Sequence, residues 1–254
     1  MDKFFKQTKA IWQDLLSNNS DVTPFEQLFE QLHYLKFAEA NSSVIYVFNA
    51  KEFKNEYIST NVKEVLGYVG HEDSVHYFFD KLAPNHADFP LILTQLQTKA
   101  FQKMCIEDRK HTRLTACGMA FQHAEKGWIR ILFQTVPLEM SEDQTPLRSM
   151  VVVHDITHLI KEDFYWTRVV YGEEKTCING YLSATKEEVE GDIISKREKE
   201  VLQLIAAGKS TTEIAKSLFI SPNTLNNHRQ NLLNKIGAKD TTALVHLARI
   251  TGLI

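Results

Sequence analysis

Hydrophobic and polar positions follow three different patterns along the 254-residue chain. Over residues 1–40, apolar side chains recur at helical spacing, first around Trp12 and again after the pair Thr23-Pro24, which predicts two amphipathic helices. Such apolar stripes pack more often onto a neighbouring domain than across a dimer seam, and both alternatives stay open on the sequence.

Residues 41–160 alternate between short strand patterns and helix patterns. Strands are predicted at 44–48, 56–59, 112–122, 127–138 and 147–155, with a short helix at 61–68 and a longer one at 88–104. Two strands, then helices, then a three-stranded meander indicate an α+β fold. Residues 161–192 are predicted to be a connector: its aromatic part, 165–171, is a candidate further strand, and its acidic part, 187–192, is expected to be a solvated linker.

From residue 193 to residue 254 the pattern becomes wholly helical. Side chains that cap helix starts stand before four apolar-periodic segments, and Gly208 and Gly237 stand where the first and third segments end. The four predicted starts are Ser195 with Glu198, Ser210 with Glu213, Ser221 with Pro222, and Asp240. Four short helices with tight connections predict an all-α domain.

The third of these helices has an unusual exposed face. At 100° per residue, Leu225, Leu232 and Ile236 fall on one side and face the core. The other side carries carboxamides at Asn223, Asn227, Gln230, Asn231 and Asn234, with Asn226 on the flank. Asn is a poor helix former, whereas Asn and Gln can pair two hydrogen bonds with an adenine edge in the major groove. The alternative is a polar face that only meets solvent.

Charge is divided unevenly between this helical segment and the rest. Nine basic and four acidic side chains give residues 195–254 a net charge of +5, which leaves −8 for the other 194 residues, since the whole chain carries −3. A basic module on an acidic body favours a nucleic-acid partner at one end of the chain.

Residues 193–254 closely resemble the LuxR-type (GerE-like) helix-turn-helix family. The match runs without a gap through 194–202, Gly208, 213–215, Leu218, Ile220-Ser221, Thr224-Leu225 and His228. The resemblance implies that the second and third helices form the DNA-reading pair, that the third enters the major groove, and that the fourth helix dimerises. Leu244 and Leu247 are the candidate dimerisation residues.

Two departures from the family pattern shift the expected phosphate contacts. Asn226 stands where the family often has Lys, and Thr241 stands where Arg is common. Phosphate binding is therefore expected to depend more on Lys196, Arg229, Lys235 and Lys239 and on the segment around Thr211-Thr212. The residues expected to contact double-stranded DNA are Asn223, Thr224, Asn226, Asn227, Arg229, Gln230, Asn231, Lys235, Lys196, Thr211 and Thr212.

Residues 41–160 are similar to the PAS sensor family. The similarity is carried by the strand 44–48, by 57–59, by 65–68, and by the closing Asp155-Ile156-Thr157, although the His-Pro-Asp-Asp turn common in the family is broken here at 83–86. The resemblance implies a small molecule held between sheet and helices, and it makes Asp155 and Thr157 candidate couplers of sensor and output. Asp155 could also be a simple strand-end cap. No flavin motif or haem-ligand spacing is found, so the ligand or cofactor stays unknown.

The remaining sequence features argue against a catalytic site, a metal site and a membrane span. The three cysteines form no Cys-x-x-Cys pair, and no nucleophile motif, phosphate loop or metal-ligand set is present, so no catalytic residue and no metal site is predicted. No apolar run approaches the roughly 20 residues of a membrane span, and no signal peptide is evident, so a cytoplasmic location and no membrane partner are expected.

These patterns predict four segments and one leading function. The segments are 1–40 (amphipathic helices), 41–160 (PAS-like α+β sensor domain), 161–192 (connector) and 193–254 (all-α, four-helix helix-turn-helix domain). The leading interpretation is a homodimeric transcriptional regulator in which a signal sensed by the PAS-like domain controls DNA binding. The alternative is a protein-interaction scaffold whose PAS-like domain serves dimerisation only.

Overall fold

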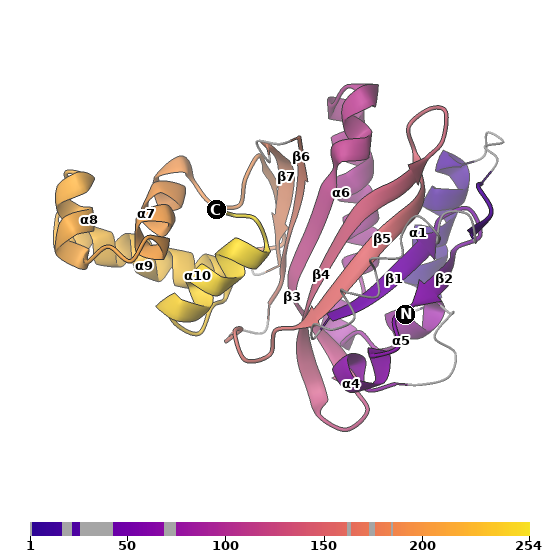
Figure 1. The fold of residues 1–254 in the computed structure, drawn as a ribbon, viewed down its shortest axis with the longest axis horizontal. Helices are drawn as coiled ribbons and strands as arrows, with labels where there is room; N and C mark the ends of the chain where they lie inside the picture. The colour runs from indigo at the N-terminus through magenta and orange to yellow at the C-terminus, as the bar shows by residue number, and fades with distance from the viewer. Residues whose placement is uncertain are drawn as a thin grey trace.

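A single antiparallel sheet occupies the middle of the molecule. The structure, a computed structural model, describes residues 2–16, 22–25, 43–68, 75–161, 164–172, 176–183 and 185–254. Figure 1 shows helices α1, α4, α5 and α6 on one side of the sheet and the helical group α7 to α10 on the other. The sheet therefore separates two helical layers that belong to different ends of the sequence.

The sheet has the strand order β2-β1-β5-β4-β3-β6-β7-β8. Its first five strands are close to those predicted, and they confirm the α+β reading of this region. The eight strands are β1 (Ser43–Asn49), β2 (Lys54–Ile58), β3 (Arg113–His123), β4 (Gly127–Met140), β5 (Pro146–Asp155), β6 (Trp166–Tyr171), β7 (Thr176–Leu182) and β8 (Glu187–Glu190).

Helices at the start of the chain and between β2 and β3 cover one face of the sheet. The first N-terminal helix and the long helix predicted at 88–104 are confirmed, whereas most of the second N-terminal helix prediction lies outside the described residues. The helices are α1 (Asp2–Leu15), α4 (Val62–Leu66), α5 (Val75–Asp80) and α6 (Phe89–Lys103), with 3-10 turns at η1 (Pro84–His86) and η2 (Ile106–His111).

The acidic part of the connector is a strand, so the prediction of a solvated linker at 187–192 is wrong. Residues of β8 pair with β7 at the edge of the sheet, with Glu188 opposite Tyr181. Two lysines of α6 contact the acidic strand: Lys99 Nζ lies 2.6 Å from Glu188 Oε2, and Lys103 Nζ lies 2.9 Å from Glu190 Oε1. The partners of these acidic residues come from a helix that is distant in the sequence. Residues 187–192 taken alone therefore have the composition of a solvated linker, although their segment forms the edge strand of the sheet.

Helices α7 to α10 are capped as the sequence predicts. They are α7 (Lys196–Ala206), α8 (Thr211–Ser217), α9 (Pro222–Ile236) and α10 (Thr241–Ile250). Both capping boxes form, since the Ser195 and Ser210 side chains each accept from the third helical amide while Glu198 and Glu213 bond back. These reciprocal caps fix the starts of α7 and α8.

The helical group packs directly on the sheet. Cys117 of β3, Leu132 of β4 and Trp166 of β6 share one buried cluster with the cores of α7, α9 and α10. Trp166 Nε1 donates to the Ile236 carbonyl oxygen at 3.3 Å, and Gly237 follows at φ +71°, where a side-chain carbon would lie 2.8 Å from the Phe164 ring. Glycine is therefore required at this contact both for backbone conformation and for space.

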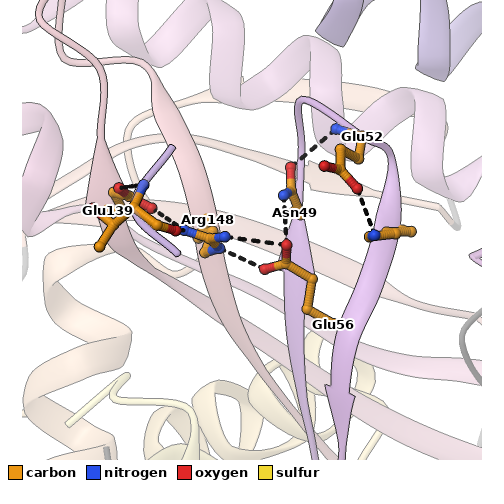
Figure 2. Close-up of polar contacts among 7 residues, drawn as sticks. Asn49, Glu52, Glu56, Glu139 and Arg148 are labelled. Carbon is orange, nitrogen blue, oxygen red and sulfur yellow. Dashed lines mark hydrogen bonds and ion pairs between the residues drawn. The ribbon is translucent and has the colours of Figure 1, made fainter. Parts of the chain in front are cut away.

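A buried arginine joins four parts of the sheet domain (Figure 2). The Arg148 guanidinium on β5 is 3% exposed and contacts Glu56 of β2 at 2.5 Å and Glu139 of β4 at 2.5 Å, and it also donates to the Thr23 carbonyl oxygen at 2.6 Å. Asn49 of β1 donates to the same Glu56 carboxylate. Burial tends to raise the pKa of Glu56, but the hydrogen bonds from Arg148 and Asn49 outweigh it and hold the pKa below its usual value.

Replacing this arginine tests whether the network is needed for folding. We expect Arg148→Met to lower the free energy of unfolding by about 3–5 kcal/mol, because two nearly buried carboxylates lose their cation. Urea denaturation followed by tryptophan fluorescence measures the loss. The control is Lys54→Met, which removes the half-exposed partner of Glu52 and should cost about 0–1 kcal/mol. Equal losses for both variants would contradict a structural role for the network.

Candidate nucleic-acid interface

Helices α8 and α9 form an angular pair joined by a tight turn. The turn contains Phe219 at φ +54°, and Ser221 caps α9 by accepting from the Thr224 amide at 3.0 Å. Leu225, Leu232 and Ile236 are fully buried, as the helical projection predicts. These three contacts with the domain core determine which side of α9 faces outward.

The carboxamides of α9 lie on its exposed side. Asn223, Asn226, Asn227, Gln230, Asn231 and Asn234 are all exposed, as is Thr224. Gln230 Nε2 donates to Asn234 Oδ1 at 2.9 Å, so part of this face is ordered by its own hydrogen bonds. Thr224 Oγ1 lies 2.8 Å from Ser221 Oγ and thus belongs to the helix cap. The remaining amides face outward with donors and acceptors on one surface.

One cation links this face to the start of α8. Arg229 Nη1 lies 3.4 Å from Asn226 Oδ1, and its Nη2 lies 3.4 Å from Thr211 Oγ1. Thr212, next to Thr211, is exposed at the start of α8, and Lys196 is exposed at the start of α7. Arg229 is therefore the basic residue that the structure places beside the carboxamides.

Two other predicted phosphate-binding lysines contact groups of the chain itself. Lys235 Nζ lies 2.9 Å from Glu198 Oε2, which is nearly buried and caps α7. Burial tends to raise the pKa of Glu198, but hydrogen bonds from Lys235 and Ser195 outweigh it and lower the pKa. Lys239 Nζ donates to the Thr157 carbonyl oxygen at 3.0 Å. Contact of either lysine with DNA stays a prediction, and it would have to replace or share these bonds.

The predicted coupling residues form a turn at the end of β5. Asp155 Oδ1 accepts from the Thr157 amide at 2.9 Å and from its hydroxyl at 2.5 Å, while Thr157 Oγ1 accepts from the Arg130 amide at 2.8 Å. Asp155 therefore caps the strand end, and the same turn touches the helical domain through Lys239. Coupling through this turn stays a prediction.

The predicted dimerisation residues lie inside the chain's own core. Leu244 and Leu247 are both 0% exposed in the cluster that α10 shares with the sheet. The exposed positions of α10 are Thr242, His246 and Arg249. A dimer through α10 stays a prediction, and in this arrangement its contacts would begin at these three residues.

A cavity lies on the other face of the sheet, and the sequence did not indicate which residues form it. Its volume is about 130 Å³. The N-terminal helix α1 contributes to its wall together with α5, α6 and five strands. The lining residues are Thr8, Trp12, Tyr46, Phe48, Phe53, Asn55, Val75, Phe78, Phe79, Phe89, Pro90, Leu93, Thr94, Gln97, Leu114, Phe133, Thr135, Ser149 and Val151.

The described residues offer neither a metal-ligand set nor a membrane-spanning helix. They contain no group of three or more His, Cys, Asp or Glu side chains placed to hold a metal ion. In that same part of the chain, no helix is long and apolar enough to cross a membrane.

The α8–turn–α9 geometry, with α7 packed behind it, defines a helix-turn-helix domain. Residues 192–248 match the family described as bacterial regulatory proteins, luxR family. The spore germination protein GerE of Bacillus subtilis (strain 168) is 44% identical over 59 residues, which are 23% of this chain and 80% of GerE. The chain belongs to the luxR family of bacterial regulatory proteins through this domain.

Strong similarity to other relatives covers only a short part of each chain, and similarity over most of the chain is weak. The regulatory protein SdiA of Escherichia coli (strain K12) is 50% identical over 60 residues, so the match covers 24% of this chain and only 25% of SdiA. A solved structure of VqmA bound to DPO covers 88% of both chains at 16% identity and a TM-score of 0.32. Similarity at that level does not establish a shared function.

The Lys235–Glu198 contact gives a pH-dependent prediction. Because the folded-state pKa of Glu198 is lowered, its contribution to stability is present above the usual value of 4.5 and is lost as the pH falls through the folded pKa. We expect Lys235→Met to cost about 1–3 kcal/mol of unfolding free energy at pH 7 and less as the pH falls toward 3. Urea denaturation at several pH values measures this. The exposed Lys216→Met is the control, and a loss independent of pH would contradict the assignment.

Proposed function

We propose that this protein is a DNA-binding transcriptional regulator that reads the major groove with α9 and responds to a small molecule held by a PAS-like sensor domain. The observation that carries the proposal is the set of six exposed carboxamides on one side of α9, within a domain that matches the luxR family. A helix whose outer face offers paired donors and acceptors is suited to reading base edges.

The charge of the domain supports binding to a polyanion. The +5 net charge of residues 195–254 attracts phosphates, Arg229 contacts Asn226 of the carboxamide face, and Lys196 is exposed at the start of α7. Phosphate contacts would position the helix, while Asn227 and Gln230 would select bases. Because carboxamides pair best with adenine, we expect A·T-rich half-sites.

The sheet domain supports the sensing part of the proposal. Strands β2-β1-β5-β4-β3, with helices inserted between β2 and β3, form the arrangement expected of a PAS-like domain. The cavity lies between this sheet and its helices, which is where such folds take a ligand. Strands β6 to β8 extend the sheet toward the helix-turn-helix domain.

Direct contacts between the two domains provide a route for regulation. Besides Lys239 and Thr157, the Lys161 amide donates to the Gly237 carbonyl oxygen at 2.8 Å and the Lys239 amide donates to the Leu159 carbonyl oxygen at 3.0 Å. A ligand that favours one docking arrangement by about 1–3 kcal/mol would change DNA affinity about 5- to 150-fold. Two half-sites would require a homodimer.

The base-reading assignment is tested by selecting DNA from a random library with the full-length protein at two salt concentrations. We expect a paired half-site motif, and we expect Asn227→Ala with Gln230→Ala to weaken binding to it at least about tenfold, since each paired base contact contributes about 1–3 kcal/mol. Gln203→Ala, on the exposed side of α7, is the matched control.

Salt dependence separates base contacts from phosphate contacts in the same experiment. Lys196→Met should weaken all sequences similarly and reduce the salt slope by about one. Unchanged selectivity in the double variant would contradict the role of α9. A wild-type protein that binds no double-stranded DNA would favour the interaction-scaffold alternative.

The docking contact is tested by hydrogen exchange in the full-length protein. We expect Lys239→Met to speed exchange of the Lys161 amide about tenfold, because loss of a charged hydrogen bond makes domain opening easier. Lys209→Met, an exposed change between α7 and α8, is the control. If the Lys161 amide exchanges equally in both variants, the Lys239–Thr157 bond does not hold the domains together.

A further inference from the structure

We propose that the cavity takes a small, uncharged molecule built on one aromatic ring, and that Thr8 of the N-terminal helix provides a hydrogen bond to it. This inference rests on the proposed sensing function and specifies the chemistry of the same site. It follows from the size of the cavity, the character of its walls, and one buried hydroxyl group.

The size of the cavity limits the ligand to about one ring. Its volume of about 130 Å³ is slightly below the roughly 150 Å³ of an engineered apolar cavity in another protein that binds benzene. A fused polycyclic cofactor or a long acyl chain would extend beyond this volume. A six-membered ring with one or two small substituents fits the space.

Aromatic side chains dominate the walls. Phe48 and Phe53 meet edge to face with centroids 5.4 Å apart, and the Trp12 ring lies 6.5 Å from Phe48. Phe89 and Phe133 form another edge-to-face pair at 6.1 Å on the opposite part of the lining. A planar ring between such pairs would make further edge-to-face contacts, which a saturated chain cannot.

The lining selects against charge. Its described residues include no Lys, Arg, His, Asp or Glu, and its polar side-chain groups are hydroxyls, carboxamides and the Trp12 indole N–H. An ionised ligand would therefore meet no counter-charge among the described lining residues, which is unfavourable. A neutral ligand with one donor or acceptor can instead pair with these groups.

Thr8 is the polar residue that most clearly lacks a partner. It is 4% exposed, and its Oγ1 has no hydrogen-bond partner among the residues that the structure describes. Buried hydroxyls are nearly always bonded. Thr94, which also lines the cavity, donates to the Pro90 carbonyl oxygen at 3.0 Å. The difference between these two threonines indicates that Thr8 is the one positioned to bond a ligand.

This assignment makes α1 part of the binding site. Trp12 of α1 packs with Phe53 and Leu147 around the β1–β2 turn, and both Trp12 and Thr8 line the cavity. The N-terminal helix therefore forms part of the wall of this cavity, so ligand binding should stabilise the docking of α1.

Benzamide and benzoate provide a matched test, because they share a shape and differ in charge at pH 7. Using calorimetry and ligand-observed NMR on the full-length protein, we expect benzamide to bind saturably and benzoate to bind at least about tenfold more weakly. Thr8→Val should weaken benzamide about five- to tenfold without lowering the stability of the free protein, since it removes an unpaired hydroxyl. Thr8→Ser should retain the affinity, and Thr98→Val, on α6 outside the lining, should change it less than about twofold.

The outcomes distinguish a failure of the ligand inference from a failure of the proposed function. Absence of benzamide binding, equal binding of benzoate, or unchanged affinity in Thr8→Val would overturn it. If the protein selects a DNA motif but does not bind benzamide, the ligand class is wrong and the regulator proposal stands. If it binds benzamide with the expected variant pattern but no DNA, the ligand inference stands and the regulator proposal falls.

Discussion

The central strands of the sheet must be covered on both faces, and the rest of the structure depends on this requirement. On β4, Leu132 packs into the cluster with the helix-turn-helix domain, while the next residue, Phe133, lines the cavity. Gln134 Nε2 then donates to the Ile250 carbonyl oxygen of α10, and Thr135 lines the cavity again. Side chains alternate along a strand, so one short segment touches both sites.

The helix-turn-helix domain could be predicted from sequence because its signals are local. The Ser195 and Ser210 capping boxes, Pro222 at the start of α9 and Gly237 at its end each act within a few residues of one another. The exposed face of α9 could be predicted from the helical period alone, because Leu225 and Leu232 had to lie on the buried side. The first five strands were predictable for the same reason.

What the sequence could not show depends on contacts between distant segments. Glu188 belongs to a strand because its segment pairs with β7, and its ion-pair partner Lys99 lies far away in the chain. Lys235 and Lys239 looked like phosphate ligands until their partners, Glu198 and the Thr157 carbonyl oxygen, were visible. Thr8 resembled an ordinary polar position of an amphipathic helix, because only the folded chain brings α1 to the cavity.

The alternation on β4 also limits how regulation can work. A ligand shifts a conformational equilibrium only by the difference in its affinity for the two states. Filling the cavity without moving Phe133 or Thr135 would stabilise the sheet domain and leave the docking of α10 unchanged. A closely packed interior responds to displacement because its neighbours have little free space. A ligand that displaces Phe133 would therefore also alter the packing at Leu132, which lies in the cluster shared with the helix-turn-helix domain.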